Sequence, residues 1–251
     1  MKTKLLYLIS IVLLSGMLLI GCAGTSQSED ALQLSEHALS AAPGLDNFSF
    51  QPVQGTQDEI LAVHAAERAK PVVYEISSVD GSPAMAALGD DQSLQAVLFT
   101  AMGDAPTQTV QLLRGTEVVF ETPAGMPSPA LPLQALLTYD GNWAMEILYA
   151  DENTWAGQVF IDGELLNTQK GYDEAFGLQL LAGKPFYFYM RDGHAGYSYD
   201  SKETDLDYTQ IPHYNCCSES VINPVPAENM VAFFAQRDGA WYYVELGAFG
   251  E

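Results

Sequence analysis

Basic residues are scarce in this sequence. The 251 residues include ten Lys and Arg against 32 Asp and Glu, so the formal net charge is −22 at pH 7. A surface of this sign repels phosphate backbones, which argues against nucleic-acid binding. It also disfavours direct adsorption on anionic lipid, so attachment to a membrane needs another source of affinity.

Cysteine is scarce too, and recognised catalytic motifs are missing. The three cysteines form no Cys-x-x-Cys pair, and the sequence holds no Gly-x-Ser-x-Gly elbow, no Walker-type phosphate loop and no His-Glu-x-x-His. Neither the ligand set of a zinc site nor the regular oxygen spacing of a calcium loop is present. We therefore predict no metal site, no cofactor and no catalytic residue.

The N-terminal residues have the three parts of an export signal. Lys2 and Lys4 precede an uncharged apolar run over 5–20, which is shorter than the roughly 20 apolar residues of a membrane-spanning helix. The run ends in Leu-Ile-Gly-Cys at 19–22, which resembles the lipobox of bacterial lipoproteins. The resemblance implies a signal peptide over 1–21, a diacylated Cys22, and a chain anchored by lipid to the extracytoplasmic face of the cell membrane.

The signal is followed by a stretch without a visible core. Residues 22–46 are rich in Ser, Gly, Gln and Glu and poor in β-branched and aromatic residues, which predicts a flexible tether. Residues 47–251 then form the folded domain. All 32 acidic residues lie after Cys22, whereas Lys2 and Lys4 belong to the signal, so the mature charge is 8 − 32 = −24.

The domain contains a repeated hairpin pattern. Apolar or aromatic runs lead into an Asp-Gly pair and leave as a second such run, which predicts a type I′ turn because both central residues need positive φ. The pairs stand at 80–81, 140–141, 192–193 and 238–239, and a weaker copy over 94–113 turns near Gly103. Successive Asp-Gly pairs are 60, 52 and 46 residues apart. Units with this spacing predict an all-β fold, most simply a small β-propeller-like domain, with a β-sandwich or an open meander as the alternative.

One family resembles these repeats. The stretch 139–144, Tyr-Asp-Gly-Asn-Trp-Ala, and the later Asp-Gly-Glu followed by Tyr-Asp-Glu are similar to the WD40-like repeats of TolB-type bacterial β-propellers. The resemblance covers roughly residues 72–247 and implies a propeller-like fold. It does not imply a function, since the fold hosts many.

Four residues are candidates for chemistry or ligand contact. Cys216 and Cys217 are adjacent, and neighbouring Cα atoms lie about 3.8 Å apart, closer than an unstrained disulfide needs. Both a strained vicinal disulfide and two packed thiols remain open. His213 precedes this pair, and Trp155 follows a polar stretch at 151–154, where an exposed indole can stack on a sugar or anchor a partner.

These patterns favour a function in binding. A rigid repeated β scaffold with variable loops, and without a recognised catalytic set, predicts a non-enzymatic binding or scaffold module for a protein, peptide or glycan partner. The alternative is a cell-envelope glycan hydrolase, because abundant carboxylates supply the acid pair that such enzymes use.

Overall fold

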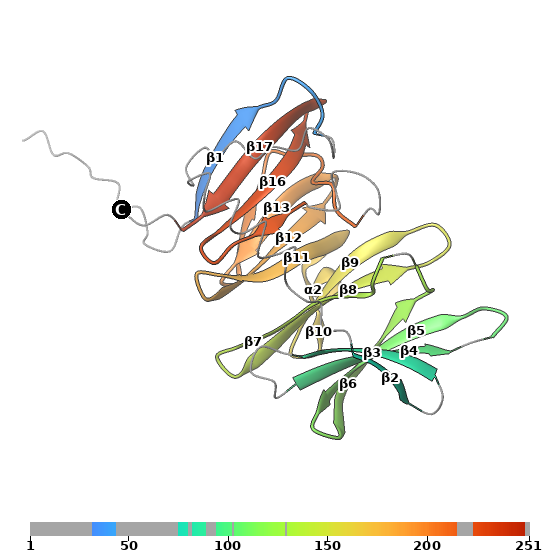
Figure 1. Cartoon of the computed structure of the whole chain (residues 1–251). Coiled ribbons are helices and arrows are strands. Elements are labelled where there is room, and N and C mark those ends of the chain that lie inside the picture. The colour runs from blue at the N-terminus through green and yellow to red at the C-terminus, as the bar shows by residue number, and fades with distance from the viewer. Residues whose placement is uncertain are drawn as a thin grey trace, which may run out of the picture. The chain divides into compact units, whose positions relative to one another are not determined.

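The computed structural model describes residues 32–43, 75–79, 82–88, 94–101, 103–128, 130–214 and 223–248, with only the backbone described over 75–88. All of them belong to one unit, Leu32–Glu251. Their regular secondary structure is almost entirely antiparallel β-sheet, and α2 (Leu166–Lys170) is a single helical turn (Figure 1). The all-β prediction is confirmed.

Three sheets contain the strands. Sheet A has the order β1 (Gln33–Ala38), β17 (Ala240–Gly247), β16 (Met230–Arg237), β15 (Val225–Pro226). Sheet C has the order β11 (Glu174–Leu181), β12 (Lys184–Arg191), β13 (His194–Tyr199), β14 (Lys202–Asp205). Sheet B has the order β10 (Glu164–Leu165), β9 (Trp155–Ile161), β8 (Asn142–Ala150), β6 (Glu117–Gly125), β5 (Thr107–Arg114), β4 (Leu94–Ala101), β3 (Ser82–Leu88), β2 (Glu75–Val79), and β7 (Leu133–Tyr139) also pairs with β8.

The predicted Asp-Gly turns join these strands. Three pairs have positive φ at both residues: Asp140 and Gly141 (47° and 81°), Asp192 and Gly193 (52° and 76°), Asp238 and Gly239 (51° and 77°). Asp80 and Gly81 lie outside the described residues, although the strands on either side of them pair with each other. The weaker hairpin is also present, as β4 pairs with β5 over its whole length.

Sheet B consists of two meanders that meet at one point. Strands β6 and β8 pair only through Gly125 and Ala150, in parallel. Gly125 has φ +80°, and a Cβ there would lie 1.9 Å from the Ala150 carbonyl oxygen. No side chain fits this approach, so glycine is required for the junction.

The two meanders of sheet B, sheet C and sheet A stack face to face, and buried clusters of side chains fill the spaces between them. One cluster joins β4–β6 to β7–β9, a second joins β8 and β9 to sheet C, and a third joins sheet C to sheet A. Strand β12 contributes to clusters on both of its faces. Phe186 and Phe188 belong to the third cluster, and Tyr187 and Tyr189 belong to the second. Both faces of β12 are therefore buried, and truncating one such Phe to Ala typically costs about 3–5 kcal/mol.

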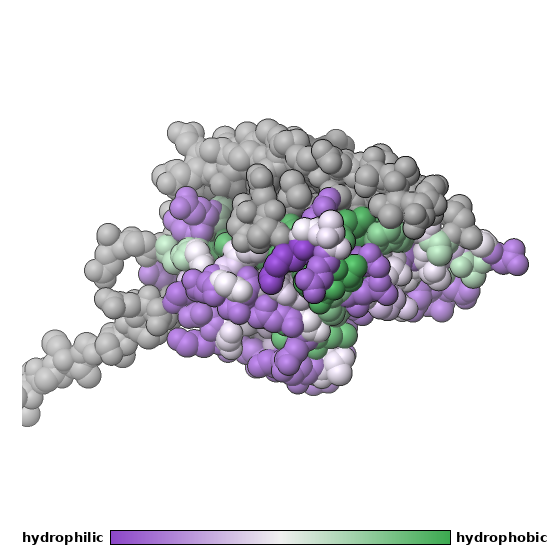
Figure 2. All heavy atoms as spheres, turned by 90° about the horizontal axis from the view of Figure 1, so that it is seen from below, coloured by the Kyte–Doolittle hydropathy of each residue, from purple (hydrophilic) through white to green (hydrophobic). Residues whose placement is uncertain are grey.

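The described sheets are open. Within the described ranges no barrel or propeller closes, and this agrees with the open-meander alternative. In the view of Figure 2, hydrophilic residues make up most of the described surface, as the composition predicts. No helix among the described residues is long and apolar enough to cross a membrane.

Part of the predicted tether is ordered. Residues 33–38 form β1, which pairs antiparallel with β17 at the edge of sheet A (Figure 1). The expectation of a flexible tether over 22–46 is therefore wrong for this segment. The stretch carries little apolar surface of its own, and its order comes from main-chain pairing with a strand 200 residues away. Cys22 and the rest of the signal lie outside the described residues.

Candidate functional site: a cleft between two sheets

A cavity of about 430 Å³ opens where the end of sheet B meets sheet C. Strands β9 and β10 and helix α2 form one wall, and strands β12 and β13 form the other. The lining residues are Ile161, Asp162, Glu164, Leu166, Gln169, Lys170, Pro185, Tyr187, Ser198 and Ser201. A smaller cavity, of about 250 Å³, lies beside the turn at Asp140 and Gly141.

Local hydrogen bonds fix the α2 wall. Asn167 donates to the Gly157 carbonyl (2.9 Å) and accepts from the Val159 N–H (3.2 Å), which ties the helical turn to β9. The helix ends at Gly171, which has left-handed φ of 70°. Because Leu166 is buried beneath, Gln169 and Lys170 are held at the rim of the cleft.

The floor of the cleft combines apolar surface with side-chain hydroxyl groups. Tyr187 and Ser198 are 4% and 1% exposed, and both line the cavity. The Tyr187 hydroxyl lies 3.5 Å from that of Tyr172. A buried hydroxyl facing a cavity is a ready donor and acceptor for a polar ligand.

The rim is polar and carries more negative than positive charge. Glu164 accepts from the Gln169 amide (2.8 Å), and one Asp162 oxygen accepts from the Trp143 N–H (3.0 Å). Lys170 forms an ion pair with Glu203 at 3.2 Å, so part of its charge is already neutralised. The cleft therefore favours neutral hydroxyl-bearing or cationic ligands over anions.

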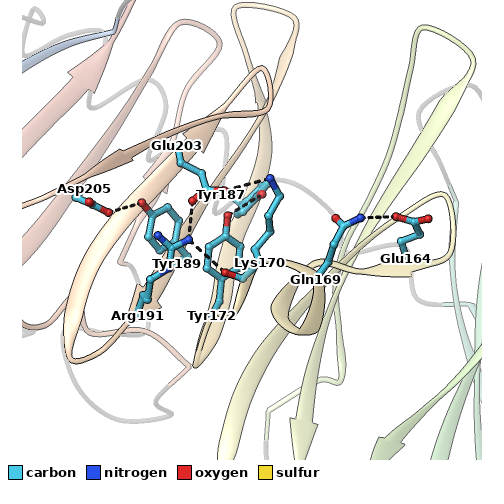
Figure 3. A network of polar contacts seen from close by, with 9 residues as sticks. All are labelled: Glu164, Gln169, Lys170, Tyr172, Tyr187, Tyr189, Arg191, Glu203 and Asp205. Carbon is cyan, nitrogen blue, oxygen red and sulfur yellow. Dashed lines mark hydrogen bonds and ion pairs between the residues drawn. The ribbon is translucent and has the colours of Figure 1, made fainter.

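A network of aromatic rings and charges stiffens the adjoining wall (Figure 3). Arg191 lies 5.1 Å from the ring centroid of Tyr172 and 4.9 Å from that of Tyr189, and the two rings stack at 4.4 Å. Arg191 also donates to Glu203 (2.6 Å), and Tyr189 donates to Asp205 (2.7 Å). The groups hold one another in place, so this wall needs little reordering when a ligand binds.

The network also keeps its protonation states fixed. Burial and the neighbouring Tyr187 hydroxyl raise the pKa of Tyr172, and burial and Asp205 raise the pKa of Tyr189, so both stay neutral. Burial opposes ionisation of Glu203, but hydrogen bonds from Arg191 and Lys170 outweigh it and lower the Glu203 pKa. The wall keeps its charges across the neutral range.

A buried carboxylate lies between β8 and β11, away from the cleft. Glu146 accepts from the Leu178 N–H (2.6 Å) and from the Tyr214 hydroxyl, and burial raises its pKa. Tyr214 has φ +57°, an unusual value for a bulky residue, and Gly157 leaves room for its hydroxyl. Glu146 lines neither described cavity, so its geometry is that of a structural link between sheets.

Two of the four sequence-predicted residues are described, and both lie outside the cleft. Trp155 is the first residue of β9 and is 40% exposed. The His213 ring stacks on Phe176 at 3.5 Å, and its Nε2 lies 3.0 Å from Glu174. Neither lines the cavity, and Cys216 and Cys217 lie outside the described residues. No group of His, Cys, Asp or Glu within the described ranges is arranged to hold a metal ion.

Sequence reasoning missed the cleft residues. The Asp-Gly-Glu at 162–164 and the Tyr-Asp-Glu at 172–174 were visible as part of the TolB-type resemblance, but nothing in them indicated a cavity. The second wall comes from a different hairpin, and only the stacking of two sheets brings Asp162 and Gln169 close to Ser198. Comparison with known proteins found no matching family model, no matching curated protein and no matching solved structure.

Proposed function

We propose that this chain is a lipid-anchored, non-enzymatic binding module on the extracytoplasmic face of a bacterial membrane. The cleft between sheets B and C carries the proposal, because it combines a preorganised wall, buried hydroxyls and a polar rim. Of the protein, peptide and glycan partners that the sequence suggests, this lining best fits a neutral, hydroxyl-rich glycan segment. The lipid on Cys22 supplies the membrane affinity that the acidic surface does not.

We also propose that the domain is propeller-like, and its stacked meanders support this. Successive antiparallel units that bury both faces are how a propeller arranges its blades, and the Tyr139–Ala144 resemblance to TolB-type repeats points the same way. On this view the cleft lies between adjacent blades, and the strand pairings hold its walls at a fixed spacing.

A panel of ligands with the mature, detergent-solubilised chain tests the function. A ligand at about 100 times its dissociation constant adds roughly 2.7 kcal/mol, which raises the Tm of a domain of this size by about 5–10 °C. We expect neutral oligosaccharides to produce such a shift and Gln169→Ala to reduce it. Asn142→Ala, at the smaller cavity, is the matched control. If no glycan or peptide shifts the Tm, or if both variants act alike, the cleft is not the binding site.

A hydrolase remains the second candidate because two carboxylates, Asp162 and Glu164, line the cleft. The same oligosaccharides, incubated with the chain and assayed for new reducing ends, separate the two functions. Release of sugar that is abolished by Glu164→Gln supports the hydrolase. Binding without release supports the module.

A further inference from the structure

Sheets A and C carry the same charged contact at the same register. In sheet C, Arg191 ends β12 and donates to Glu203 of β14. In sheet A, Arg237 ends β16 and donates to Glu36 of β1 (2.7 Å). Each arginine precedes an Asp-Gly turn and lies over two tyrosine rings.

The strand pairings match residue by residue. Four positions before Arg191 stands Tyr187, which pairs with Ser198, which in turn pairs with Glu203. In sheet A the corresponding chain of pairs starts four positions before Arg237 and runs through Phe233, Val244 and Glu36. Strand β1 is therefore the equivalent of β14, although it comes from the opposite end of the chain.

Strand β1 is held lightly compared with the strand beside it. No side chain of β1 is fully buried, whereas five consecutive residues of β17, over 243–247, are. Besides main-chain pairing, β1 is held by the Glu36 carboxylate, which accepts from Arg237 and from Tyr208. An edge bound in this way can lose its outer strand without loss of the core.

The β17 edge has the properties of a strand-binding site. Removing β1 leaves main-chain groups unpaired along a strand with buried side chains, which is a strong template for another extended segment. The Arg237 guanidinium lies 5.4 Å from the ring centroid of Tyr208 and 4.2 Å from that of Tyr242. In this position it favours a segment with a carboxylate at the register of Glu36. Residues 33–38 of a second copy have that sequence by definition, and exchange of identical elements is an easy route to dimers.

We propose that the β17 edge is a strand-binding site, filled by residues 33–38 of the same chain and open to the same segment of a second copy. Glu36 is the residue that sets the register and the strength of the contact. The site is independent of the cleft and of its ligand. If Cys22 is acylated, ten residues, 23–32, separate the strand from the anchor. Residues 33–38 of two anchored copies would then lie at the same distance along the chain from the membrane.

Hydrogen exchange on the full mature chain tests the hold of the strand. Charge-assisted hydrogen bonds are about twice as strong as neutral ones, so Glu36→Gln should speed exchange of the β1 and β17 amides by about five- to tenfold. Sheet C should be unchanged. Glu203→Gln is the matched control: it should affect sheet C and leave β1 and β17 unchanged. Unchanged β17 protection in the Glu36→Gln chain would overturn the proposal.

Uptake of a labelled peptide covering residues 32–43 tests the site itself. We expect saturable binding to the Glu36→Gln chain, binding about five- to tenfold weaker for a peptide with Gln at that position, and no gain in the Glu203→Gln chain. Failure of the Glu36→Gln chain to bind the peptide, when exchange shows its own strand released, refutes the site. Equal binding of a scrambled peptide refutes its specificity.

Discussion

The Glu146 carboxylate accepts the main-chain N–H of Leu178 at 2.6 Å, and so joins β8 in sheet B to β11 in sheet C. The two residues are 32 positions apart, and Leu178 stands where the β11 ladder shifts register between Phe176 and Gln179. The irregularity frees a donor that regular pairing would have used. The buried carboxylate is thus a specific partner for a local break in the sheet.

This contact predicts an unusual pH dependence of stability. Burial raises the pKa of Glu146, an effect that the hydrogen bonds from Tyr214 and Leu178 only partly offset. A raised pKa in the folded state gives stability that is complete below the unfolded value of about 4.3 and is lost as pH rises through the folded value. Glu146→Gln keeps the shape, with its oxygen toward Leu178 and its amide toward the Tyr214 hydroxyl.

We therefore expect the unfolding free energy of Glu146→Gln to increase relative to that of the natural chain as pH rises from 5 to 8. Urea unfolding at several pH values measures it. Glu121→Gln, at an exposed carboxylate of β6 that accepts from Gln111, should leave the two pH curves parallel. Parallel curves for Glu146→Gln would mean that the carboxyl titrates alike in the folded and unfolded chains.

Local chemistry explains which parts of the fold the sequence predicts. The Asp-Gly turns are recognisable because Asp140 and Gly141 need only their own backbone preferences to form a turn. Strand β1 is different, because Glu36 contacts Arg237 across 201 positions of the sequence, a pairing that no local preference indicates. The cleft is hidden for the same reason, since Gln169 and Ser198 share a cavity only through sheet stacking. Contacts of this kind leave no periodic signal in the chain.

The Gly125 junction predicts a sharp difference between two glycine substitutions. An alanine Cβ at 125 would lie 1.9 Å from the Ala150 carbonyl oxygen and would also strain a backbone with φ +80°. Relieving the clash means parting β6 from β8, so we expect Gly125→Ala to cost at least about 3 kcal/mol. Gly115 also has positive φ, but open space surrounds it, so Gly115→Ala should cost only about 1 kcal/mol. Urea midpoints with unchanged slopes test this, and equal losses would show that conformation alone matters.

Asn223 provides the last prediction, because its buried side chain links Pro212 to strand β16. The amide donates to the carbonyls of Pro212 (2.8 Å) and Phe234 (3.0 Å), and its oxygen accepts from the Phe234 N–H (2.7 Å). Alanine would leave the main-chain groups of β16 unpaired in a buried site, where each costs about 1–3 kcal/mol. We expect Asn223→Ala to lower the unfolding free energy by about 2–4 kcal/mol.

The exposed Asn142→Ala should cost less than about 0.5 kcal/mol. Hydrogen exchange locates the effect: the Phe234 amide should lose its protection in Asn223→Ala before the rest of sheet A does. Uniform loss across all sheets would instead make Asn223 part of the global core and not a local link between Pro212 and β16.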